Sequence, residues 1–158
     1  MKKLFSLLVI SFLSFGLSGQ IPIGKDKDEG SEAVIRHMKD LGYTLYNQET
    51  THAMKFNRVT EQADIIGEEY KVVRFKEEIT FSIYYNSYGN ITSVYVHFES
   101  FDMRERFLQD YQLNTWTLIK TRTDVLGEDL IFKIDDYYAL LPLDNNIPQV
   151  NFFREMPE

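Results

Sequence analysis

Apolar and polar residues alternate with a period of two through residues 79–98. This alternation predicts two antiparallel strands, Ile79–Asn86 and Ile91–Phe98, joined as a hairpin with one buried face. A four-residue loop, Ser87–Asn90, separates the two faces cleanly, whereas a three-residue loop sends the valines of the second strand outward. We therefore expect the first register. Its inward face collects Ile79, Phe81, Ile83, Tyr85, Val94, Val96 and Phe98.

Residues 28–42 have the 3.6-residue period of an amphipathic helix. Apolar residues recur on one face, and Gly42 follows the last of them as a residue that can adopt the left-handed conformation of a helix end. The apolar positions are Val34, Ile35, Met38 and Leu41. The pattern leaves two readings of the helix start, because Gly30 and Ser31 fit either a cap or an interruption of the first turn.

A second helix is predicted from Asp102 onward. The spacing of Asp102 to Glu105 fits a capping box in which the aspartate is the N-cap. The inner face of this helix then carries Met103, Phe107, Leu108 and Tyr111.

The other strands follow from β-branched and aromatic residues between turn residues. They are predicted at Tyr43–Gln48, Ala53–Arg58, Tyr70–Lys76, Trp116–Arg122, Leu130–Ile134, Tyr137–Leu143 and Gln149–Arg154, with a loop over 60–69. The order predicts an α+β fold, an antiparallel sheet with two helices on one face. The similar segments 43–45 and 116–118 suggest a tandem repeat of helix then strands.

The N-terminus has the three-part plan of a secretory signal peptide. Lys2 and Lys3 precede an apolar run, and small residues follow it at Gly16, Ser18 and Gly19. We expect a signal peptide at 1–19 and a single α+β domain at 20–158. The run is shorter than the roughly 20 apolar residues of a membrane span, so we expect none after cleavage. We therefore expect a secreted or periplasmic protein. It has no disulfides, because the chain has no cysteine.

Charge and motifs limit the kinds of activity and partner that we expect for this chain. The chain has 17 basic and 24 acidic residues, a balance opposite to that of proteins that neutralise nucleic-acid phosphates. It has no nucleophile elbow, no glycine-rich phosphate loop and no metal-ligand spacing among its three histidines. We therefore predict no catalytic residue, metal or cofactor. A carboxylate-dependent hydrolase stays an alternative, since acidic residues from distant segments could converge in a cleft.

The outer face of the predicted hairpin supplies the candidate binding residues. Tyr84 and Tyr95 lie diagonally across it, His97 is on the same face, and Tyr88 is in the turn. With both helices on the opposite face, this surface is open to a protein or a carbohydrate partner. The competing interpretation is that the rings only stabilise the sheet, since cross-strand pairs contribute roughly 0.2–1 kcal/mol.

Short N-terminal motifs carry a family resemblance. Gly24 and Lys25 lead into the first helix, and Gly42 and Tyr43 end it before an aromatic-rich sheet. This arrangement resembles small secreted proteins of unknown function from Bacteroidota-type bacteria, and the tandem plan resembles β-lactamase-inhibitor-like and outer-membrane assembly lipoprotein domains. No activity follows from either resemblance. We expect an exported, non-catalytic binding or accessory module, with a self-assembling envelope protein as a further alternative.

Overall fold

The computed structural model describes residues 21–57, 62–110, 115–124, 127–143 and 148–157. Its elements are α1 (Lys27–Asp40), β1 (Leu45–Asn57), β2 (Gln62–Phe75), β3 (Thr80–Tyr85), β4 (Ile91–His97), α2 (Phe101–Asp110), β5 (Thr117–Asp124), β6 (Gly127–Ile134), β7 (Tyr137–Pro142) and β8 (Gln149–Phe153). The predicted signal peptide and Tyr111 lie outside the described residues. Within these ranges no helix is long and apolar enough to cross a membrane.

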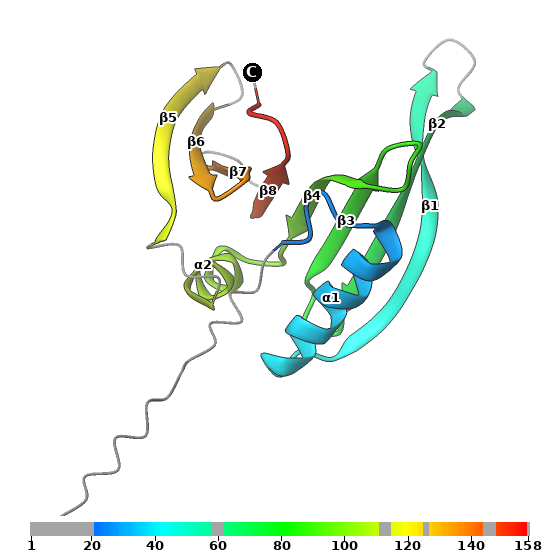
Figure 1. The fold of residues 1–158 in the computed structure, drawn as a ribbon, viewed down its shortest axis with the longest axis horizontal. Helices are drawn as coiled ribbons and strands as arrows, with labels where there is room; N and C mark the ends of the chain where they lie inside the picture. The colour runs from blue at the N-terminus through cyan, green and yellow to red at the C-terminus, as the bar shows by residue number, and fades with distance from the viewer. Residues whose placement is uncertain (1–20, 58–61, 111–114, 125–126, 144–147, 158) are drawn as a thin grey trace, which may run out of the picture.

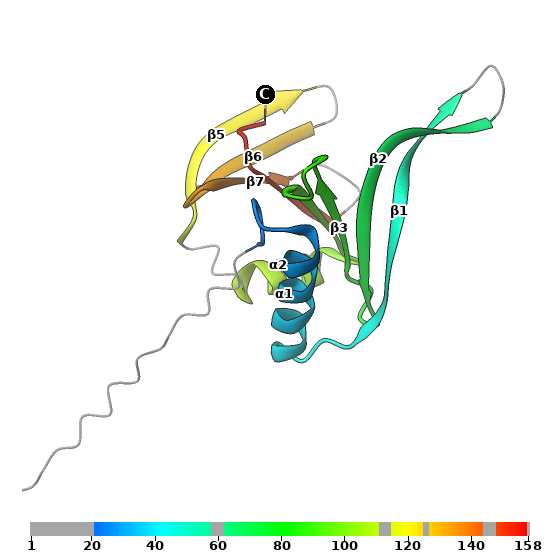
Figure 2. The same ribbon diagram turned by 45° about the vertical axis from the view of Figure 1, so that its right-hand side comes forward.

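The strands form one eight-stranded antiparallel sheet, so the predicted α+β class with an antiparallel sheet is confirmed. The strand order is β1-β2-β3-β4-β8-β7-β6-β5, and each helix is followed by a four-stranded meander. The last strands of the two meanders, β4 and β8, pair with each other at the centre of the sheet. The ribbons β1–β2 and β5–β6 rise on opposite sides of the shorter central strands (Figures 1 and 2).

One hydrophobic core joins both helices to alternate positions of the sheet. Val34 and Met38 of α1 and Phe107 of α2 belong to the same buried cluster. The ring of Phe107 lies 6.1 Å from that of Phe81 on β3 and 5.1 Å from that of Phe98. Since burying one large apolar side chain contributes roughly 1.5–3 kcal/mol, this cluster is the main stabilising feature of the fold.

The β3–β4 hairpin has the register that the hydrophobic pattern favours. Pairing runs from Thr80 opposite His97 to Tyr84 opposite Ser93. A β-bulge then shifts the register by one, so that Tyr85 pairs with Ile91. The predicted inward residues other than Tyr85 are all buried: Ile79, Phe81, Ile83, Val94, Val96 and Phe98.

The predicted loop over 60–69 is wrong where the structure describes it. Residues from Gln62 onward belong to β2, which pairs with β1 from Asn57 back to Leu45. The two separate strands expected before it are a single strand, β1, and its bulge between His52 and Met54 lies close to the predicted break. The sequence is polar here, and cross-strand hydrogen bonding supplies the regularity that local pattern does not show.

Helix α1 begins at Lys27, which resolves the ambiguous start. The Asp26 carboxylate is the N-cap and accepts hydrogen bonds from the backbone N–H groups of Asp28 at 2.8 Å and Glu29 at 3.4 Å. Gly30 is therefore inside the helix. A Cβ at this position would lie 2.2 Å from Ile91 Cδ1, so glycine lets the helix approach the β3–β4 hairpin closely. Gly42 follows the C-cap with φ +93°, as predicted.

Helix α2 begins at Phe101, and the predicted Asp102 cap is wrong. The hydroxyl of Ser100 accepts a hydrogen bond from the backbone N–H of Met103 at 3.3 Å, which is the contact of an N-cap residue. One polar residue on the inner side escaped the sequence pattern. Arg104 is buried and donates to the carbonyl of Pro142 at 2.8 Å, which ties α2 to the end of β7.

Candidate functional site

The second face of the sheet, opposite the core residues, is organised in rungs that cross the strands. Directly paired residues of antiparallel strands point to the same face, so the strand pairings identify each rung. We name the first the aromatic rung; it consists of Thr51, Tyr70, Tyr84, Ser93, Phe153, Tyr138, Lys133 and Thr117. We name the next the middle rung; it consists of Glu49, Val72, Ser82, Tyr95, Asn151, Leu140, Ile131 and Lys120.

Four rings on this face form a continuous chain, which we call the tyrosine cluster. Tyr70 stacks on Tyr84 with centroids 4.5 Å apart and planes at 16°. Tyr84 meets Tyr95 at 5.3 Å, and Tyr95 meets Phe153 at 5.6 Å, both edge to face. Ser93, which has a small side chain, pairs with both Tyr84 and Phe153, and the Tyr95 ring contacts both of these rings. Two of the predicted residues, Tyr84 and Tyr95, are thus brought together.

The geometry of the Tyr70–Tyr84 pair indicates how its two rings are oriented relative to the sheet. Neighbouring strands are about 4.8 Å apart, close to the 4.5 Å between these two parallel rings. The stacking direction therefore runs along the rung, and the ring faces are turned toward each other and not outward. Both rings are half-buried. The surface that they present consists mainly of ring edges and phenol groups.

Three apolar residues of the middle rung are buried. Val72, Leu140 and Ile131 are buried on it although the core lies on the other face. Between Tyr95 and Leu140, the side chain of Asn151 is only 6% exposed, and its Oδ1 has no hydrogen-bond partner among the described residues. An unsatisfied buried acceptor costs roughly 1–3 kcal/mol. We therefore expect Asn151 to contribute less to the free energy of unfolding than an apolar side chain of similar size would at this position.

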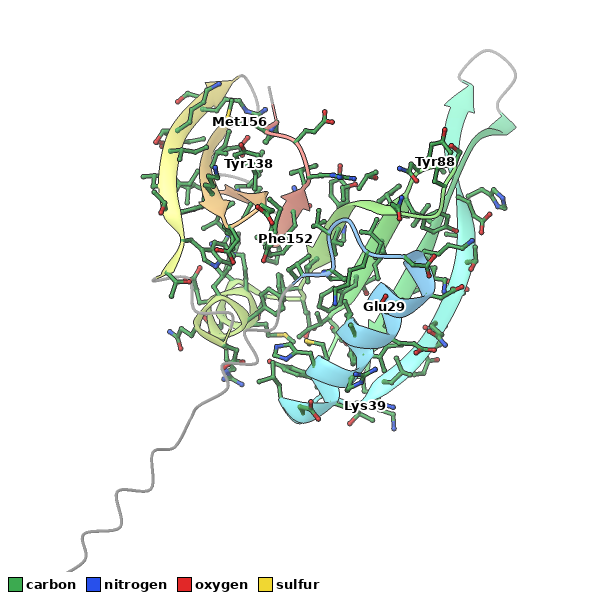
Figure 3. All side chains as sticks on the ribbon, viewed as in Figure 1. Glu29, Lys39, Tyr88, Tyr138, Phe152 and Met156 are labelled. Atoms are coloured by element: carbon green, nitrogen blue, oxygen red, sulfur yellow. The ribbon has the colours of Figure 1, made fainter. Side chains whose placement is uncertain are left out.

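The two other predicted binding residues lie apart from the cluster. His97 is on the same face but on the next rung beyond Tyr95, opposite Thr80 and Gln149. It is half-buried, and burial lowers its pKa. Tyr88 is in the β3–β4 turn and is 86% exposed (Figure 3). Neither ring takes part in the ring contacts of the tyrosine cluster.

Tyr85 was expected in the core, and this prediction is wrong. It lies on the inward side but at the end of the strand, beside the start of α1, where its hydroxyl donates to Glu69 Oε1 at 2.6 Å. Lys27 lies 4.7 Å from its ring centroid and 4.0 Å from the same carboxylate oxygen. Burial and this hydrogen bond raise the pKa of Tyr85, and the hydrogen bond from Tyr85 lowers the pKa of Glu69. A polar contact between helix and sheet replaces the expected apolar packing.

A groove of about 870 Å³ lies beside the tyrosine cluster. Its lining includes Tyr84 and Tyr95, residues of the β3–β4 turn such as Ser87, and Ala53 and Glu69 of the β1–β2 ribbon. A second hollow of about 350 Å³ has four of the same lining residues and extends to Phe153. The shared residues are Asn86, Thr92, Ser93 and Tyr95. Aromatic edges thus adjoin a polar groove.

Two carboxylates from separate segments, Glu78 and Glu99, interact with each other away from this groove. A hydrogen bond with Glu99, and the charge of Glu99, raise the pKa of Glu78. Both residues are exposed, and the hollow that Glu78 helps to line does not include Glu99. In the groove beside the tyrosine cluster, the carboxylate among the lining residues is Glu69, which Tyr85 and Lys27 already contact. Glu78 and Glu99 therefore do not line that hollow together.

Sequence reasoning missed Tyr70 and Phe153. Tyr70 was predicted to begin a strand and Phe153 to lie in the last one, but the pairing of those strands with β3 and β4 was not predicted. Alternation along β8 could have identified Phe153, because neighbouring residues of a strand point to opposite faces and Phe152 is buried in the core. Comparison of the chain with family models, curated proteins and solved structures finds no match.

Proposed function

We propose that this protein is an exported, non-catalytic binding module, and that its second sheet face takes a partner protein. The observation that carries the proposal is the tyrosine cluster beside the groove. Tyrosine rings combine apolar area with a hydroxyl and are enriched at protein interfaces. The signal peptide predicted from the sequence at residues 1–19 supports export. We infer that α1 and α2 cover the same face, since their buried residues share one core cluster, and that the other face is left for the partner.

The ring geometry favours a protein over a carbohydrate. A sugar ring stacks on the flat face of an aromatic side chain. In the Tyr70–Tyr84 stack those faces are turned along the sheet, and the contacts of Tyr95 with Tyr84 and Phe153 occupy further ring surface. Ring edges and phenol groups instead suit a protein surface, where an apolar contact and a hydrogen bond are made side by side. The buried Val72 and Leu140 support such a site with a packed floor.

The test is capture of a partner by the chain without residues 1–19, compared between variants. Replacing Tyr84 and Tyr95 by serine removes two rings of the cluster. Tyr46→Ser is the matched control, because Tyr46 is 69% exposed on the edge strand β1 and takes part in none of the ring contacts. We expect an envelope protein, identified by mass spectrometry, that is captured by the unaltered chain and by the control but not by the double variant.

Folding must be separated from binding in this test. Circular dichroism and urea unfolding check each variant, since cross-strand ring pairs contribute roughly 0.2–1 kcal/mol each. The milder pair Tyr84→Phe and Tyr95→Phe keeps the rings and removes only the hydroxyls. If the folded serine variant and the unaltered chain captured the partner equally, the proposal would be rejected, and the rings would serve only to stabilise the sheet.

A further inference from the structure

The β1–β2 ribbon extends beyond β3, the strand that flanks it (Figures 1 and 2). β2 pairs with β1 from Phe75 to Gln62, but its pairing with β3 on the other side covers only Tyr70–Arg74. Since β1 and β3 are the neighbours of β2 in the sheet, no strand within the described ranges pairs with residues 62–69 on the β3 side. β2 therefore has an open edge here, although it is not an outer strand of the sheet.

An open edge of this kind presents backbone groups that can pair with another strand. In an antiparallel pair, alternate residues direct their N–H and C=O groups to each side, so about half of these groups in 62–69 are directed away from β1. A register shift opposite Ala53 places a bulge in this stretch, and the bulge bends it. At roughly 3.4 Å per residue, the edge is about 25 Å long. Because a two-stranded ribbon is only marginally stable by itself, a third strand would stabilise this end of the ribbon.

The groove of about 870 Å³ lies at this edge. Its lining includes Ala53 and Glu69 of the ribbon, the β3–β4 turn, and Tyr84 and Tyr95 of the tyrosine cluster. Its charged lining residues are Lys27 and Glu69, and the 4.0 Å between Lys27 Nζ and Glu69 Oε1 lets their charges offset each other. A groove without an excess of charge suits the uncharged main chain of a peptide. A segment within it would also contact the tyrosine cluster.

We propose that the partner places an extended segment in this groove, and that the segment pairs with the open edge of β2, in line with β3. This inference rests on the proposed function. The main-chain hydrogen bonds of an added strand supply affinity, and its side chains at alternate positions supply specificity. Successive side chains of the segment point to opposite faces of the sheet. Those on the second face contact Tyr84, whereas the others point toward the start of α1.

The experiment uses the protein captured in the previous test, purified and titrated by calorimetry. Ala53→Trp places a large ring in the groove. His52→Trp is the matched control, because His52 is the exposed neighbour of Ala53 on the same strand and is not among the residues that line the groove. We expect Ala53→Trp to weaken binding at least about tenfold, and the control to bind as the unaltered chain does. Circular dichroism and urea unfolding check that both variants fold.

Hydrogen exchange of the unaltered chain, followed by mass spectrometry, tests the backbone pairing without any variant. The amides of 62–69 that face the groove should exchange at least about tenfold more slowly in the complex than in the free chain. The outer edge strand β5 serves as the control, and its amides should exchange equally in both states.

The other outcomes separate the two proposals. Unchanged exchange over 62–69, or equal binding of Ala53→Trp and the unaltered chain, with binding still lost in the Tyr84 and Tyr95 variant, would overturn strand addition and leave the binding face intact. No tyrosine-dependent capture would overturn both. Slowed exchange over 62–69 in the concentrated chain without the partner, together with dimers in light scattering, would assign the edge to a second copy and reject a strand from the partner.

Discussion

Alanine at position 30 should destabilise the protein, although alanine is the better helix former. Gly30 is inside α1, where replacing glycine by alanine contributes about 1 kcal/mol through helix propensity. The new Cβ, however, would lie 2.2 Å from Ile91 Cδ1 and 3.0 Å from Pro22 Cβ. Ile91 is fully buried, so its side chain has little freedom to move aside. Overpacking of this kind costs about 1–3 kcal/mol, and at such short contacts we expect the upper part of that range.

The expected net loss is about 1–2 kcal/mol in the free energy of unfolding, measured by urea denaturation. Ile91→Val supplies the matched test, because it removes Cδ1 and alone costs about 0.5–1.5 kcal/mol. The double variant should lose at least about 0.5 kcal/mol less than the sum of the single losses, since the closest contact is gone. Additive losses, or a Gly30→Ala variant more stable than the unaltered chain, would show that the helix does not approach the hairpin this closely.

Three further predictions concern the groups around the sheet. Burial raises the pKa of Tyr137 to about 12, so the folded protein favours the neutral form of this side chain. The free energy of unfolding should therefore fall as pH rises from about 10 toward 12. Urea titrations at several pH values should show a smaller fall in Tyr137→Phe. The hydrogen bond from Tyr85 lowers the pKa of Glu69, so stability from this contact is present above the usual glutamate range and lost as pH falls through the lowered value. In Tyr85→Phe the Glu69 pKa should rise in a carboxylate NMR titration; an unchanged pKa would contradict the contact. Asn151→Leu should keep or raise the unfolding free energy, because it removes an unsatisfied acceptor, and a loss above about 2 kcal/mol would show that Oδ1 is bonded after all.

The sequence predicted those parts of the fold that depend on local pattern. The β3–β4 register followed from alternation alone, because one slip would have placed Val94 and Val96 in solvent. The end of α1 followed from Gly42. The start of α1 did not, because the N-cap is Asp26 and Gly30 is inside the helix. Glycine at position 30 is explained by its close approach to Ile91, a contact between residues far apart in the sequence.

Only two of the four residues of the tyrosine cluster were predicted from the sequence. Tyr84 and Tyr95 share a hairpin, so their proximity follows from its register. Tyr70 and Phe153 reach them through pairings of β2 with β3 and of β8 with β4, which no local pattern specifies. The long polar β1–β2 ribbon was missed for the same reason, because its regularity comes from pairing between strands. Tyr85 was misplaced because alternation gives the face of a residue but not where the core ends.

The measurement that tests the central claim most directly is binding of the purified captured protein to the folded Tyr84→Ser, Tyr95→Ser variant, with Tyr46→Ser as control. Removing two central rings of an interface cluster should cost at least about 2 kcal/mol, or roughly thirtyfold in Kd, while the control binds as the unaltered chain does. Equal affinity of all three proteins would contradict the claim that this sheet face is the binding surface.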